Sequence, residues 1–81
     1  MNFGQALAMA KEGSAIQRSG WNGKGLLVRL QVPDANSKMT LPYLYMEYPM
    51  DVQNTPGARV PWLASQTDIL AEDWQSPPVS A

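Results

Sequence analysis

Residues 26–32 read Leu-Leu-Val-Arg-Leu-Gln-Val, and this stretch decides the fold class. Successive side chains of a β-strand point to opposite faces. The alternation therefore predicts a strand with one apolar face and one mixed face. The apolar face carries Leu26, Val28, Leu30 and Val32, and the other carries Leu27, Arg29 and Gln31.

Shorter strands are predicted on both sides of this one, at residues 15–18, 41–48, 58–60 and around Trp74. Asn22-Gly23 favours a tight turn before residues 26–32. Pro56-Gly57 suits the central positions of a type II turn before residues 58–60. Prolines at both ends of residues 41–48 favour an edge position in the sheet for that strand.

Two helices are predicted from their capping residues. Asn2 with Gln5 three positions later is typical of a capping box, and Gly13 marks the end of a helix over residues 2–13. Ser65 followed by Asp68 predicts a second helix of one or two turns. The chain is thus expected to be an α+β domain: an N-terminal helix packed on a small twisted antiparallel β-sheet of about four strands, with a short C-terminal helix. We expect one compact domain over residues 1–75 and a flexible tail over residues 76–81.

Composition narrows the function. The 81 residues contain no Cys and no His, which excludes disulfides, zinc sites built on thiolate or imidazole, and Cys- or His-dependent nucleophilic catalysis. The net charge of −1 argues against binding to polymeric nucleic acid. No apolar run is long enough to cross a membrane, and the N-terminus lacks the pattern of a signal peptide, so we expect a cytoplasmic protein. A core this small favours self-association.

Three tryptophans, Trp21, Trp62 and Trp74, are many for a chain of 81 residues. They either fill a small core or present ring faces to a flat ligand, and stacking contributes about 1–3 kcal/mol per base. Trp21 stands out because it lies in a glycine-rich turn.

Polar residues that could meet a nucleotide are scattered along the chain. Glycines around Lys24 would let a phosphate approach the backbone, although a plain hairpin turn is the favoured explanation for them. Asp68 is either a helix cap or an acceptor for ribose hydroxyls. Arg29 and Arg59 are either surface residues or phosphate ligands. No residue pattern indicates a metal site.

Several segments together resemble a known family. They are residues 1–7 (MNFGQAL), residues 20–25 (GWNGKG), Tyr45-Met46, and above all residues 60–74 (VPWLASQTDILAEDW). In order and spacing these are similar to the phage and prophage proteins of the Thoeris anti-defence type two family. The resemblance implies a non-enzymatic sponge that binds and sequesters, without cleaving it, the cyclic ADP-ribose isomer (gcADPR) made from NAD by the TIR-domain enzymes of the Thoeris system. The signal then cannot activate its effector.

The resemblance further implies a homotetramer in the cytoplasm of the host bacterium, with pockets between subunits and no cofactor. Motif positions then predict the ligand-binding residues Phe3, Trp21, Asn22, Lys24, Trp62, Asp68 and Trp74. Three alternatives stay open: a sponge for the cyclic oligonucleotide signals of a second defence system (CBASS), a hydrolase of the same signal, and a protein-binding inhibitor or structural phage protein.

Overall fold

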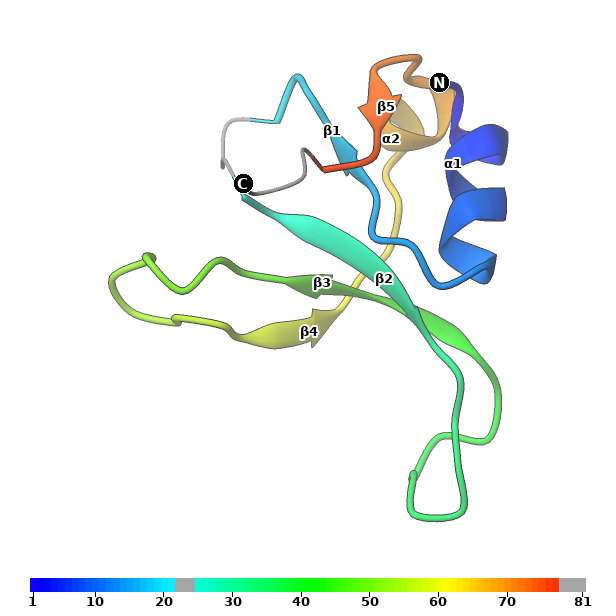
Figure 1. The fold of residues 1–81 in the computed structure, drawn as a ribbon, viewed down its shortest axis with the longest axis vertical. Helices are drawn as coiled ribbons and strands as arrows, with labels where there is room; N and C mark the ends of the chain where they lie inside the picture. Colours follow the sequence, from blue (N-terminus) through cyan, green and yellow to red (C-terminus); the bar gives the residue numbers. More distant parts are fainter. Residues whose placement is uncertain (22–24, 78–81) are drawn as a thin grey trace.

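The computed structural model describes residues 1–21 and 25–77. Two helices and five short strands follow one another along this part of the chain (Figure 1). In order they are α1 (Phe3–Lys11), β1 (Gln17–Arg18), β2 (Leu27–Gln31), β3 (Tyr43–Glu47), β4 (Arg59–Pro61), α2 (Gln66–Leu70) and β5 (Trp74–Gln75). The predicted α+β class is confirmed, and each predicted element exists within a few residues of its expected position. The Asn22-Gly23 turn lies outside the described residues.

Helix α1 begins and ends where its capping residues place it. The Asn2 side chain accepts a hydrogen bond from the Gln5 backbone N–H, and the Gln5 side chain accepts one from Asn2, which completes the predicted capping box. At the other end, Gly13 has φ +100°. The N–H groups of Gly13 and Ser14 reach back to the carbonyls of Ala10 and Met9. This Schellman arrangement satisfies carbonyls that the last helical turn leaves without partners.

Strands β2, β3 and β4 form an antiparallel sheet in that order. Val28 of β2 lies opposite Met46 of β3, and Met46 lies opposite Val60 of β4. The predicted edge position of residues 41–48 is therefore wrong, because β3 is the central strand. The flanking prolines lie just outside β3, so the ladder loses no N–H donor. The predicted type II turn into β4 is supported by φ +68° at Gly57.

A second, two-stranded antiparallel sheet pairs β1 with β5. One isolated bridge, between Ile16 and Val28, connects it to the larger sheet. Instead of one sheet of about four strands, the chain thus forms two separate sheets, which are bridged at Ile16. Residues far apart in sequence, such as Arg18 and Trp74, become direct neighbours in this way.

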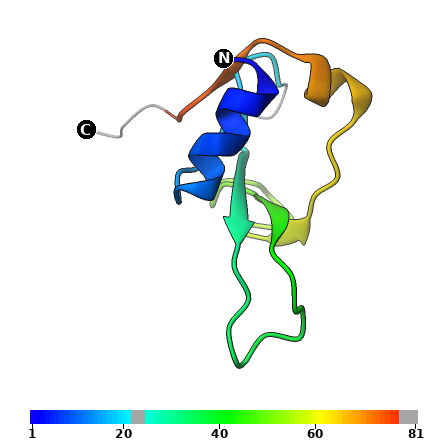
Figure 2. The same ribbon diagram turned by 90° about the vertical axis from the view of Figure 1, so that its right-hand side faces the viewer.

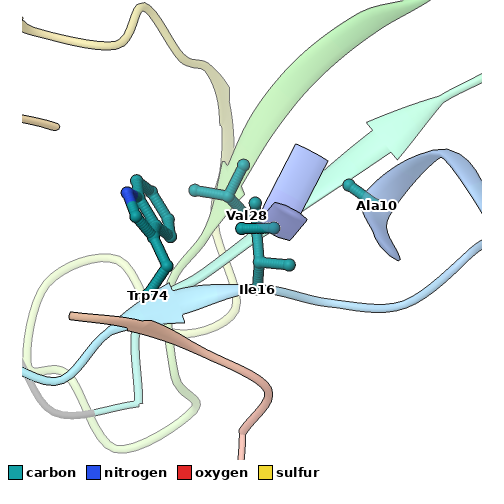
Figure 3. Packing of buried hydrophobic residues seen from close by; sticks show 5 residues of the cluster. Ala10, Ile16, Val28 and Trp74 are labelled. Atoms are coloured by element: carbon teal, nitrogen blue, oxygen red, sulfur yellow. The ribbon is translucent and has the colours of Figure 1, made fainter. Parts of the chain in front are cut away.

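The core lies where the two sheets and α1 meet. Side chains of Ala10, Ile16, Val28 and Trp74 converge there from the helix and from three strand segments (Figure 3). Ala6 completes the buried cluster. The small alanines of α1 let its backbone approach β2 and β5 closely, which explains why this stripe of the helix faces inward.

Helix α1, helix α2 and the β1–β5 ladder lie together on one side of the three-stranded sheet (Figure 1). The connection from β2 to β3 projects away from this body, as the perpendicular view confirms (Figure 2). Over residues 1–21 and 25–77, no helix has the length and apolar character that a membrane crossing requires.

Candidate ligand-binding site

An aromatic cluster surrounds Trp74, whose side chain is only 2% exposed. The ring centroids of Phe3, Trp21 and Trp62 lie 5.3, 5.4 and 6.0 Å from that of Trp74. The two tryptophan pairs are edge-to-face, a favourable arrangement for aromatic rings. Phe3, Trp21 and Trp62 are half-buried. The cluster joins the N-terminal helix, the segment after β1, the end of β4 and β5 into one packed unit.

Asp68 ties this cluster to the polar part of the fold. Its Oδ1 accepts hydrogen bonds from Arg18 Nη1 at 2.8 Å and from Trp21 Nε1 at 3.3 Å. Its Oδ2 accepts the Ser65 N–H at 3.1 Å, and this bond completes the predicted capping box of α2. The Asp68 carbonyl accepts the indole N–H of Trp74 at 2.9 Å. Asp68 is therefore a buried junction, and both of its carboxylate oxygens already have partners.

Arg18 bridges Asp68 and a second carboxylate, Asp73. Arg18 Nε lies 2.8 Å from Asp73 Oδ1, and Asp73 Oδ2 accepts the Gly20 N–H at 2.8 Å. The hydrogen bond from Arg18 lowers the pKa of Asp73; burial opposes it and the Gly20 N–H adds to it. Burial raises the pKa of Asp68, but the hydrogen bonds from Arg18 and Ser65 outweigh it, so this pKa is also below its ordinary value. Both carboxylates are thus held ionised.

An apolar groove lies beside the cluster, between the segment that enters β3 and the end of β4. Its volume is about 500 Å³, within the range of small-molecule pockets. Trp62 belongs to the aromatic cluster and also lines this groove, because its N–H continues the β3–β4 ladder by bonding to the Leu44 carbonyl at 3.1 Å. The remaining lining residues are Met39, Thr40, Leu41, Pro42, Tyr43, Leu44 and Pro61.

A smaller pocket of about 120 Å³ adjoins the groove on the outward face of the sheet. Apolar atoms make up most of its lining, and we call it the polar pocket because glutamine, tyrosine and arginine side chains also line it. It is lined by Gln31, Tyr43, Tyr45, Arg59, Val60 and Pro61. Next to it, Glu47 accepts hydrogen bonds from Arg59 Nε at 2.9 Å and from Arg29 Nε at 3.3 Å. The bond from Arg59 lowers the pKa of Glu47; burial opposes it and Arg29 adds to it. Two cations therefore share one carboxylate.

The described residues, 1–21 and 25–77, contain no group of three or more acidic side chains that could hold a metal ion. In the same part of the chain, every buried side-chain nitrogen and oxygen has a hydrogen-bond partner. Buried polar atoms in this part of the chain therefore do not mark an unfilled site, and the two surface hollows are candidate places for a ligand.

Comparison with known proteins identifies the family of the chain. The family described as the Thoeris anti-defense 2-like domain matches residues 1–76 of the chain. The chain belongs to this family. A curated relative, the Thoeris anti-defense 2 protein of Bacillus phage SP01, is 35% identical in an alignment 82 residues long that covers 91% of this chain and 91% of the relative. The predicted resemblance is confirmed, and membership of the Thoeris anti-defense 2-like family supports a role in phage anti-defence.

The structure of this Thoeris anti-defense 2-like chain brings together five of the seven residues predicted to bind ligand. Phe3, Trp21, Trp62, Asp68 and Trp74 are linked by ring contacts or hydrogen bonds. Among these five, only Trp62 also lines one of the two hollows. Asn22 and Lys24 lie outside the described residues. Ligand binding by the seven residues stays a prediction.

Sequence reasoning missed Arg18, the residue that organises the polar network. A cation in a two-residue strand carries no local pattern that distinguishes it from a surface side chain. It also missed Tyr43, Tyr45 and Glu47 as companions of Arg29 and Arg59. The alternation of residues 43–47 places these three on one face of β3, so the signal was present, but only the strand register sets the arginines beside them.

Proposed function

We propose that this chain binds and sequesters, without cleaving it, the cyclic ADP-ribose isomer (gcADPR) that TIR-domain enzymes of the Thoeris system make. The observation that carries the proposal is the match over residues 1–76 to the Thoeris anti-defense 2-like family, together with a curated relative at 35% identity whose match covers 91% of both chains. A sequestering protein competes with the signal's receptor, which requires nanomolar affinity, or about 12 kcal/mol of binding free energy.

The apolar groove supports the binding half of the proposal. Its volume of about 500 Å³ accommodates a nucleobase with part of its sugar. Trp62, Tyr43 and Pro61 offer the flat or apolar surfaces against which a base packs, and stacking on one aromatic ring contributes about 1–3 kcal/mol.

The state of the carboxylates supports binding rather than hydrolysis. A general acid or base works best when its pKa lies near the working pH. The pKa values of Asp68, Asp73 and Glu47 are instead lowered by arginine partners. The whole chain has no Cys or His to act as a nucleophile or base. These observations favour release of the ligand unchanged.

Self-association into a homotetramer is part of the proposal. Leu70 and Ile69 on α2 are 75% and 44% exposed, and Leu63, which precedes α2, is 91% exposed. A single chain leaves these apolar side chains in water, and a second copy would cover them. Sedimentation equilibrium of the purified chain tests this: a tetramer mass supports it, and a monomer at micromolar concentration contradicts it.

Isothermal titration calorimetry with gcADPR and a panel of cyclic oligonucleotides tests the ligand. We expect nanomolar binding of gcADPR and recovery of the intact molecule by chromatography after heat denaturation. A cleaved product would show a hydrolase. Binding of cyclic oligonucleotides alone would show a sponge for the other defence system. No nucleotide binding combined with capture of a host protein would show a protein-binding inhibitor.

A matched pair of variants tests the groove. Leu41 lines it and is 74% exposed, so Leu41→Ser removes groove surface without touching the core. Val32 is also exposed but does not line the groove, so Val32→Ser is the control. We expect Leu41→Ser to weaken gcADPR binding about tenfold, or about 1.4 kcal/mol, and Val32→Ser to leave it unchanged. Equal affinity of both variants would remove the groove from the site.

A further inference from the structure

The apolar groove and the polar pocket share two lining residues, Tyr43 and Pro61. Tyr43 lies at the start of β3, and Pro61 lies at the end of β4. The two hollows therefore adjoin one another at this end of the sheet, and we call the two shared residues the Tyr43–Pro61 ridge. A molecule longer than a single base can occupy both hollows at once by crossing the ridge.

The two hollows differ in chemistry. The groove is lined mainly by apolar side chains, including Met39, Leu41 and Trp62. The polar pocket lies on the outward sheet face, where the register sets Gln31 opposite Tyr43 and Tyr45 opposite Pro61. Its phenol hydroxyls, carboxamide and guanidinium are groups that bind the oxygens of an anion.

The arginines beside the pocket retain donors for such an anion. Arg29 and Arg59 each bond to Glu47 through Nε. Within residues 1–21 and 25–77, their Nη groups have no hydrogen-bond partner. Two guanidinium groups against one carboxylate leave a local charge of about +1, and guanidinium Nη groups suit phosphate oxygens. By contrast, Arg18 is committed through both Nε and Nη1 to Asp68 and Asp73.

We propose that the nucleotide ligand lies across the Tyr43–Pro61 ridge, with its base in the apolar groove and its diphosphate in the polar pocket against Arg59 and Tyr45. This assignment rests on the proposed function and deepens it, because it names the phosphate-binding side chains. It also gives the tryptophans different roles, although the sequence predicted that all three bind the ligand. Trp21 and Trp74 support the fold, and Trp62 contacts the ligand.

Three variants, each with a different expected effect on gcADPR binding, test the proposal by calorimetry. Arg59→Gln removes the phosphate donor and should weaken binding about tenfold or more, the usual range for a lost hydrogen bond to a charged group. Glu47→Gln removes the competing carboxylate, so it should leave binding equal or tighter. Lys11→Gln removes a cation from the far end of α1 and should change nothing. Circular dichroism melts of all three confirm that each chain is folded.

The outcome that overturns the proposal is Arg59→Gln binding within about twofold of the parent chain. Weakening by Glu47→Gln as large as that by Arg59→Gln overturns it too, because both variants then act by disturbing the sheet. If Leu41→Ser weakens binding and Arg59→Gln does not, the sponge function stands and the phosphate assignment is wrong.

Inorganic diphosphate is the second probe, and it separates failure of this proposal from failure of the proposed function. We expect it to shift the amide NMR signal of Tyr45 in the parent chain and not in Arg59→Gln. Binding of diphosphate without binding of any nucleotide overturns the proposed function and retains the polar pocket as an anion site. Absence of binding by both probes overturns both.

Discussion

Replacing Asp68 with Asn should destabilise the fold strongly for a change of a single charge. The substitution keeps the size of the side chain and removes its charge. Asp68 accepts hydrogen bonds from Arg18 Nη1, Trp21 Nε1 and the Ser65 N–H. Asn has one acceptor oxygen in place of two, so at least one donor loses its partner, and Arg18 loses one of its two counter-ions.

The magnitude follows from burial. A hydrogen bond to a charged group contributes about 1.5–3 kcal/mol, and removal of one partner from a fully buried ion pair costs about 3–5 kcal/mol. The Arg18 and Asp68 side chains retain 20% and 13% exposure, and Arg18 keeps Asp73, so the lower range applies. We expect the free energy of unfolding to fall by about 2–3 kcal/mol. For a chain of this size the melting temperature should fall by about 8–24 °C.

Urea unfolding followed by tryptophan fluorescence measures this effect, because the three indoles are within one cluster. Asp51→Asn is the matched control, since Asp51 is exposed in the β3–β4 connection. The Asp68→Asn penalty should also shrink at acid pH, where the parent carboxylate becomes protonated. A change in unfolding free energy below about 0.5 kcal/mol at pH 7, the size of an ordinary surface substitution, would refute the assignment of Asp68 as a junction.

Three other predictions concern the same core. Ile16→Ala should lower the free energy of unfolding by about 2–5 kcal/mol in urea titration, because Ile16 is fully buried where the two sheets meet; a smaller loss would mean that the sheets are held together elsewhere. Gly20→Ala should lower the melting temperature, because an added Cβ would lie 2.6 Å from Asp73 Oδ2; an unchanged melt would show that the carboxylate moves freely. Stability should fall as the pH drops below about 4, because Asp68 and Asp73 have lowered pKa values in the fold, so the unfolded chain takes up protons first. The two carboxylates contribute their full stability above the pKa they have in the unfolded chain, and this stability is lost as the pH falls through the lower pKa they have in the folded chain. An unfolding free energy that stays constant from pH 6 to pH 2 would contradict this prediction.

Local features of this chain were predictable from sequence because they depend on a few neighbouring residues. Asn2 with Gln5, and Ser65 with Asp68, form capping boxes in which each side chain satisfies a backbone N–H three positions away. The alternation of residues 26–32 predicts β2 in the same way, since the period of a strand is visible in the chain itself. The family resemblance is also a local feature, because it rests on short motifs that occur in order along the chain, above all residues 60–74.

Strand order and the partners of side chains were decided only by the tertiary structure. The prolines around β3 suggest an edge, yet β3 is central, because they lie outside residues 43–47 and leave both backbone edges free to pair with β2 and β4. Arg18 meets Asp68 and Asp73 across 50 and 55 residues of sequence, and no local pattern encodes that meeting. The three tryptophans were visible as unusual from the start, but whether a ring is buried or lines a groove depends on packing around it. Trp74 is enclosed because Phe3, Trp21 and Trp62 pack around its ring, whereas Trp62, just after β4, stays half-buried and lines the groove.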